Sequence, residues 1–192
     1  MTLVPAGDAA QLAAQRELAS ELPQASSERV VVDRVLGVLE RLLPGRGLAV
    51  RAVDLRNREP VRGYVRGALL RENIGSEPLV LSQATLDRVR LKVAVSASAR
   101  LIVRERWDSP FTGIATGFAM ALAAGGELYG VLDCGYRPGD DGAEYDEPAL
   151  RTFAHGLSIA LRTISLQEDA IGLRDYQARL LDSANAVVSC CR

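Results

Sequence analysis

The segment 116–135 restricts the fold of this chain more than any other part of the sequence. Two runs with alternating large apolar residues flank the pair Gly125-Gly126. Glycine reaches the positive φ angles that the tight turns of β-hairpins require, so the pattern predicts a hairpin. Residues two apart on a strand share a face. The residues that share a face are Phe118, Met120 and Leu122 in the first run, and Leu128, Leu132 and Cys134 in the second.

Other segments extend this hairpin into a sheet. Residues 48–55 and 61–70 have strand character, and the short charged turn 56–60 between them predicts an antiparallel pair. In the second strand the polar face, with Tyr64 between two arginines, is expected to be solvated and the other face buried. Residues 100–106 also have strand character.

Several helices are predicted around the sheet. Asp8 can cap a helix to about Leu22, and its weak apolar stripe indicates an arm outside the core. A strongly amphipathic helix is expected from Ser26 or Ser27 to about residue 43, where a Pro-Gly pair ends it. A short helix is expected from Ser82.

A long helix is expected after residue 145, with Asp146 as its N-cap. Its regular apolar stripe indicates a face buried on the sheet, and a looser stripe with a spacing near 3.5 residues continues beyond it. This continuation predicts a dimeric coiled coil. The two stripes are Leu150, Phe153, Leu157, Leu161 and Ile164, and then Ile171, Tyr176, Leu180, Ala184 and Val187.

Composition excludes several classes of protein. A length of 192 residues allows one domain with appendages, and a net charge of −1 provides no field that would attract nucleic acid. The three cysteines form no CxxC pair, and no uninterrupted apolar run reaches the about 20 residues of a membrane span. A reduced, cytoplasmic protein without a metal site or membrane span is therefore expected.

Two adjoining motifs resemble the C-terminal half of GAF domains. The strand 128–137 contains Gly-Val-Leu and is followed at 145–150 by Tyr-Asp-Glu-Pro-Ala-Leu, as GAF domains have a "G-V-L" strand before a "(F/Y)-D-E-x-x-L" helix start. Within this strand Gly130 lets another backbone approach closely. The resemblance covers roughly residues 27–168. It implies an α+β fold in which helices flank a central antiparallel sheet of five or six strands, with N- and C-terminal helical extensions.

The chain is accordingly divided into an N-terminal helical arm (1–25), a GAF-like sensory domain (26–168) and a linker helix towards a following domain (169–192). Residues 174–188 resemble the linker and first strand of a PAS domain. This resemblance implies the input part of a larger bacterial signalling protein of the sensor histidine kinase type. The expected partner is a second copy, bound through the terminal helices.

This sequence lacks the residues that carry the better-defined activities of GAF domains. The only lysine, Lys92, is not followed by the pattern of cyclic-nucleotide-binding relatives. Bilin-binding relatives attach the pigment through a loop cysteine, whereas Cys134 lies in a predicted strand and Cys190 and Cys191 lie at the end of the sequence. Sulfoxide-reducing relatives use cysteines around the pocket, and only Cys134 could lie near it.

In GAF domains the ligand lies between the sheet and the segments before the hairpin, which correspond here to residues 84–117. The alternative for every candidate is that it fills the core. Arginines at 100, 104 and 106 could meet an anionic ligand or simply face solvent, and His155, the only histidine, is expected at the surface. The candidate ligand-binding residues are Trp107, Phe111, Thr112, Phe118, Met120 and Asp133.

Three functions remain open at this point. The leading one is a sensory domain that binds a small ligand or senses a cellular state and relays it through a dimeric exit helix. The rival is a ligand-free structural spacer and dimerisation domain. An enzyme that reduces a small sulfoxide comes third, and no catalytic activity is expected. The sequence identifies no cofactor.

Overall fold

The computed structural model describes residues 6–24, 27–53, 60–66, 87, 100–101, 116–136 and 143–190. The helices are α1 (Ala6–Glu21), the 3-10 turn η1 (Leu22–Gln24), α2 (Glu28–Leu42) and α4 (Ala143–Cys190). The strands are β1 (Gly47–Val53), β2 (Pro60–Arg66), β3 (Arg100–Leu101), β4 (Thr116–Ala124) and β5 (Glu127–Tyr136). The predicted helix from Ser82 lies outside the described residues except at Asp87, which is helical, and so does most of the predicted strand 100–106.

The strands form one antiparallel sheet in the order β2-β1-β5-β4-β3. The N-terminal pair β1–β2 and the C-terminal hairpin β4–β5 meet where β1 pairs with β5. Four strands have seven residues or more, and β3 has two. The α+β fold with a central antiparallel sheet is thus confirmed, while the number of strands in the whole chain stays a prediction.

The predicted hairpin is present, and its turn has the expected chemistry. Gly125 and Gly126 have φ angles of 63° and 85°, the conformation of a primed turn that only glycine adopts readily. The register shifts between Leu122 and Ala123, which leaves Tyr129 as an extra residue on β5. Such a bulge re-aims a side chain, here towards α4.

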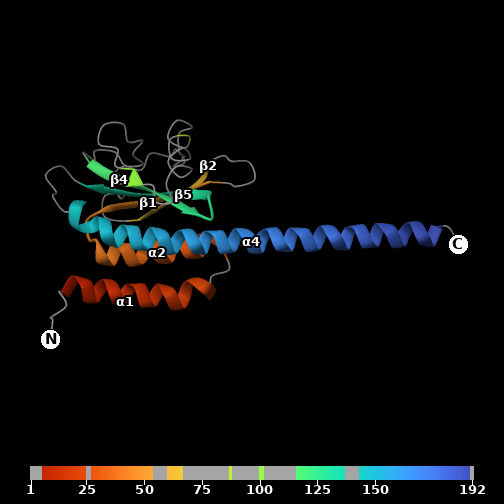
Figure 1. Ribbon diagram of the computed structural model, residues 1–192, viewed down its shortest axis with the longest axis horizontal. Coiled ribbons are helices and arrows are strands. Elements are labelled where there is room, and N and C mark those ends of the chain that lie inside the picture. Colours follow the sequence, from red (N-terminus) through yellow and green to blue (C-terminus); the bar gives the residue numbers. More distant parts are fainter. Residues whose placement is uncertain are drawn as a thin grey trace.

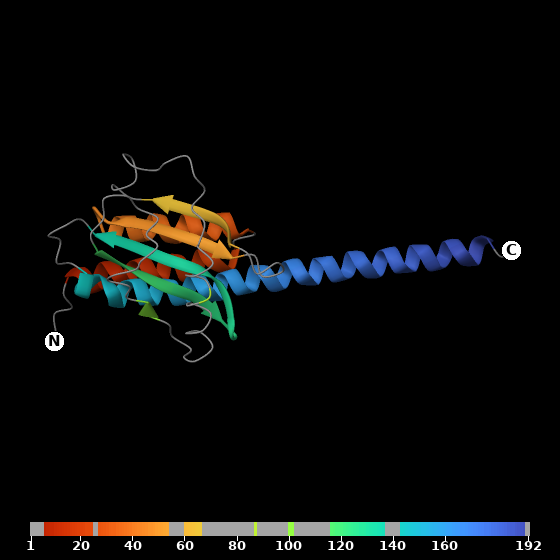
Figure 2. The ribbon, with the colours of Figure 1, turned by 90° about the horizontal axis from the view of Figure 1, so that it is seen from above.

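Two helices cover one face of the sheet (Figures 1 and 2). In these views α2 lies against β1 and β2, and α4 lies against β4 and β5. The half of α4 after residue 165 extends beyond the sheet, and its described side chains are exposed. Tyr64 is partly buried against this core and donates to Glu28 of α2 at 2.8 Å, so the expectation of a solvated face was wrong at this residue.

The core lies between the helices and the sheet. It combines the apolar stripes of α2 and α4 with one face of the central strands, and hydrophobic burial of this kind contributes about 1.5–3 kcal/mol per large side chain. The largest fully buried aliphatic side chains in it are Leu36, Leu39, Leu48, Leu122, Leu132, Leu150 and Leu157.

Gly130 brings β1 and β5 close together, as the sequence predicted. A Cβ atom at this position would lie 2.6 Å from the backbone oxygen of Arg51 and 3.1 Å from Cα of Ala52. Both neighbours belong to the backbone and cannot rotate away. Only glycine therefore fits here without moving the two strands apart.

The long helix differs from its prediction at its start. It begins at Ala143, so Asp146 lies inside the first turn and the prediction that it is the N-cap was wrong. The helix then continues through Gly172, although glycine costs about 1 kcal/mol in a helix interior. Neither this nor any other helix of the described residues has a stretch long and apolar enough to cross a membrane.

The N-terminal helix α1 lies on the outer side of α2 and α4 (Figure 1), and it contributes to the core. Ala14 and Leu18 are 7% and 5% exposed and belong to the main hydrophobic cluster. The expectation of an arm outside the core was therefore wrong at these residues. Large apolar residues alone form a weak stripe on α1, because one of the two buried positions is an alanine.

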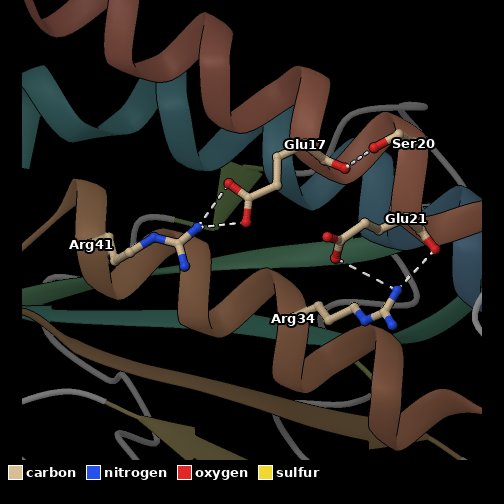
Figure 3. A network of polar contacts seen from close by, with 5 residues as sticks. All are labelled: Glu17, Ser20, Glu21, Arg34 and Arg41. Carbon is tan, nitrogen blue, oxygen red and sulfur yellow. Dashed lines mark hydrogen bonds and ion pairs between the residues drawn. The ribbon is translucent and has the colours of Figure 1, made fainter.

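Two ion pairs join α1 to α2 at the surface (Figure 3). Nη2 of Arg41 lies 2.7 Å and 2.9 Å from the two carboxylate oxygens of Glu17. Nη1 of Arg34 donates to the backbone oxygen of Glu21 at 3.1 Å and lies 3.6 Å from its carboxylate. These side chains are exposed, where an ion pair stabilises by only about 0–1 kcal/mol.

We therefore expect α1 to be held by Leu18 more than by its ion pairs. Leu18→Ala should lower the free energy of unfolding by about 2–5 kcal/mol, because it removes a buried side chain and leaves a cavity. Arg41→Ala should lower it by less than about 1 kcal/mol. Urea denaturation of both variants measures the difference. Equal effects, or a larger effect of Arg41→Ala, would contradict this assignment.

Candidate functional site

The two faces of the sheet have different side chains, and the strand register determines the face on which each residue lies. Residues directly opposite each other in neighbouring strands share a face. Val50 lies opposite Leu132, which lies opposite Met120, and all three belong to the core under the helices. The intervening positions Ala49, Asp133 and Ala119 are also opposite one another and therefore lie on the other face.

A buried ion pair lies on that other face. Nε of Arg51 donates to one carboxylate oxygen of Asp133 at 2.7 Å, and Nη2 donates to the other at 2.8 Å. The Arg51 side chain is 2% exposed and that of Asp133 is fully buried. The paired, parallel hydrogen bonds fix the planes of both groups, as bidentate contacts between arginine and carboxylate do.

Small residues and one valine lie beside the pair within the sheet, with Val131 opposite Arg51 on β5. Ala49 and Ala119 flank Asp133 on the adjacent strands, and Gly63 lies beside Arg51 on β2. The side chains of Ala49 and Ala119 are short and buried, whereas the helix-covered face is filled by leucine, valine and methionine. Buried charged groups at a floor of small residues are the features that a small-molecule site combines, since a few fixed polar groups orient a ligand in apolar surroundings.

A buried ion pair is weak evidence of a purely stabilising role. Removing two charges from water costs several kcal/mol each, and well-packed apolar side chains of similar volume are often as stable or more stable. Loss of one partner, in contrast, leaves an uncompensated buried charge. The pair therefore tolerates joint replacement better than single replacement.

This asymmetry predicts the behaviour of three variants. Asp133→Asn should lower the free energy of unfolding by about 3–5 kcal/mol, because it removes the carboxylate charge paired with the buried Arg51, and Arg51→Met should have a similar effect. The double variant Arg51→Met/Asp133→Leu should lose much less than the sum of the two single variants. Urea denaturation of the wild type and the three variants gives the coupling free energy between the two side chains. Additive losses would show that the two side chains do not act as a pair.

A second polar contact lies at the turn end of the hairpin, on the helix side. The hydroxyl of Tyr129 donates to Oε2 of Glu127 at 2.9 Å. Burial raises the pKa of Tyr129 from 10 to about 12, and the hydrogen bond to Glu127 and its negative charge act in the same direction. Arg162 of α4 opposes them. The hydrogen bond lies within β5, and the charge of Arg162 acts on Tyr129 from α4.

The raised pKa predicts a loss of stability at high pH. Below pH about 10 Tyr129 is protonated in both states and adds no pH dependence. Between pH about 10 and about 12 the unfolded chain loses this proton while the folded protein keeps it, so unfolding becomes more favourable. The free energy of unfolding should thus fall more steeply with pH in the wild type than in Tyr129→Phe. Equal slopes in urea titrations across this range would refute the assignment.

The structure separates the candidate ligand-binding residues. Asp133 lies on the face away from the helices, whereas Met120 is 5% exposed in the core on the opposite face, so these two cannot line one cavity. Phe118 is in β4, where its backbone pairs with Cys134. Trp107, Phe111 and Thr112 lie outside the described residues.

Sequence reasoning missed Arg51. A signal for it was present, because this arginine interrupts the otherwise apolar run Leu-Ala-Val-Arg-Ala-Val at 48–53. A charged residue inside a strand that is buried along its whole length needs a buried partner. The partner, Asp133, was among the candidates, but the sequence did not indicate that β1 lies beside β5.

The remaining reactive residues are placed away from this pair. Cys134 is 1% exposed in the helix-side core, where its thiol donates to the Tyr136 hydroxyl at 3.5 Å. His155 is exposed on α4, as predicted. In the part of the chain that the structure describes, no three histidine, cysteine or acidic side chains are grouped as a metal site requires.

No protein-family model and no curated protein sequence matches the chain. Many solved structures do. The phycoerythrobilin-bound GAF domain of a cyanobacterial phytochrome has a TM-score of 0.60 at 13% identity, with 88% of this chain and 100% of that domain covered. The GAF domain of the Acinetobacter phosphoenolpyruvate-protein phosphotransferase has a TM-score of 0.55 at 15% identity, with 83% and 97% covered.

A free methionine-R-sulfoxide reductase from Neisseria meningitidis, in complex with its substrate, has a TM-score of 0.54 at 14% identity, with 87% of this chain and 96% of that one covered. Identities this low show a common fold. The chain therefore has the GAF fold, which the motifs around Gly130 and residues 145–150 predicted.

Proposed function

We propose that this chain is a sensory domain that binds a small ligand on the face of the sheet away from α2 and α4. The site has the paired side chains of Arg51 and Asp133 as its polar floor. It extends to the predicted pocket residues of the segment before the hairpin, Trp107, Phe111 and Thr112. Met120 is not part of it, because it lies in the helix-side core.

One observation carries this proposal above the rest: a fully buried, bidentate ion pair lies among small residues on the sheet face that the described helices leave uncovered. Proteins of the same fold hold ligands, as the phycoerythrobilin-bound phytochrome domain and the substrate-bound reductase do. Arg51 and Asp133 provide a fixed donor and a fixed acceptor group. A polar or charged ligand could form an additional hydrogen bond with Arg51 or Asp133, or it could replace one of them as the partner of the other.

The signal is proposed to leave through α4. The buried stripe of this helix packs on β4 and β5, the strands that carry Asp133 and its neighbour Ala119. The same helix extends beyond the sheet as one continuous element to Cys190. A change in the sheet would thus reach the C-terminal end without crossing a loop. We propose that α4 dimerises and connects the domain of residues 26–168 to a cytoplasmic effector, such as a histidine kinase behind a PAS domain.

The rival function, a ligand-free spacer, is supported by a different observation. In the described residues every buried polar side-chain atom has a hydrogen-bond partner. The Arg51–Asp133 pair is thus satisfied without a ligand, as a closed structural core would require. The reductase alternative has less support, because Cys134 lies on the opposite side of the sheet from Asp133.

A thermal-shift screen separates the sensor from the spacer. Nucleotides, haem, flavin, bilins and small carboxylates are added to the wild type, and a ligand present at 100 times its Kd should stabilise the folded state by about 2.7 kcal/mol. The control is Arg51→Met/Asp133→Leu, which should fold but show no shift. A shift that the double variant retains would place the site elsewhere. No shift with any class would favour the spacer.

A further inference from the structure

Four exposed apolar side chains follow one another at intervals of seven residues along α4. They are Ile159, Leu166, Leu173 and Leu180, with 50%, 56%, 59% and 51% of their surface exposed. We call them the exposed row. Large apolar side chains at a strict seven-residue interval form a nearly straight line on a helix, which is the arrangement of the seam of a coiled coil.

The exposed row begins on the part of α4 that packs against the sheet and continues along the part that extends beyond it. Ile159 follows the buried residue Leu157 by two positions, which is about 200° around a helix of 3.6 residues per turn. The row therefore lies on the side of α4 opposite the domain core. Although α1 also contacts α4, half of the Ile159 surface stays exposed, so a second helix can reach the row without displacing the sheet or α2.

Residues four positions after the row complete a seven-residue pattern. With the row at the d positions, the a positions are Thr163, Ala170 and Gln177. The small Ala170 allows close approach of two helices, and the polar residues Thr163 and Gln177 favour a defined register. Gly156 takes the preceding a position, and a Cβ atom there would contact none of the described residues within 4 Å. Its small size is thus not required by packing against these residues.

The flanking positions favour two parallel copies. In a parallel pair each g residue lies beside the e residue five positions later on the other helix. Here Asp169 at g would lie beside Arg174 of the second copy, with opposite charges, and Tyr176 at g beside Leu181, both apolar and more than half exposed. Both contacts occur twice by symmetry.

We propose that a second copy of this chain binds to the exposed row, as a parallel and in-register two-stranded coiled coil that begins at Ile159 on the domain itself. This inference specifies the dimer on which the proposed relay rests. It also excludes Ile171 from the interface. Ile171 belongs to the looser stripe predicted from the sequence, but it occupies a b position, outside the seam.

The first test compares two variants of the full chain in sedimentation equilibrium. Leu173→Glu places a charge in the seam of both copies and should weaken dimerisation at least about a hundredfold. Ile171→Glu is the matched control, because Ile171 is 57% exposed on the same helix, and the variant should remain a dimer. Circular dichroism and thermal unfolding verify that both variants keep the domain folded. A monomeric wild type, or equal weakening by both variants, would overturn the proposal.

The charged contact provides a second test. Asp169→Arg and Arg174→Asp should each weaken the dimer, since each places like charges opposite each other. The double variant Asp169→Arg/Arg174→Asp should restore it at low salt. Failure of the double variant to recover would contradict the parallel register.

Cross-linking determines the orientation directly. In a Cys190→Ser/Cys191→Ser background, Ala170→Cys should form a disulfide-linked dimer under mild oxidation, because identical a residues meet in a parallel in-register pair. Asp175→Cys, at the outward f position, should not. An unlinked Ala170→Cys dimer would indicate an antiparallel or shifted pair and overturn the proposal. The thermal-shift screen for ligands is repeated on Leu173→Glu. The failure to find a ligand and the failure to find a dimer are thus observed in separate experiments.

Discussion

The pairing of β1 with β5 by a particular register is the constraint on which the rest of the structure depends. It places Val50 opposite Leu132 under the helices, and Ala49 opposite Asp133 on the other face. A shift by one residue would turn every side chain of β1 to the opposite face and bring Arg51 into the leucine-rich core. The apolar pattern thus fixes the register, and the same register brings together two charged residues 82 positions apart.

The local elements could be predicted from the sequence because their causes are local. The Gly125-Gly126 turn, the amphipathic α2 and the stripe of α4 each follow from periodicity and turn chemistry within one segment. The ion pair could not be predicted, because it depends on which strands become neighbours. For the same reason the sequence predicts Met120 and Asp133 in one site, although the register places them on opposite faces. The segment that contains Trp107, Phe111 and Thr112 stays a prediction.

The correction at α1 has its origin outside the helix itself. Leu18 and Ala14 are buried because α2 and α4 provide a surface on which a small and a large side chain both fit. The stripe of one helix does not reveal such a surface on others. At α4, Asp146 has the chemistry of an N-cap, but the helix starts three residues earlier at Ala143. Both helices form where the sequence predicts them, although the role of α1 and the first residue of α4 differ from the prediction.

A short stretch of α4 packs on the domain with one side and exposes its other side to the proposed second copy. Between residues 159 and 164, Ala160, Leu161 and Ile164 pack towards the domain, while Ile159 and Thr163 are exposed on the other side. A helix moves as a rod over so short a distance, because each turn is bonded to the next. If a second copy binds the exposed side, any displacement of β4 and β5 that shifts the buried side must also shift the contact between the two copies. The sheet and the proposed interface are thus coupled through a single helix.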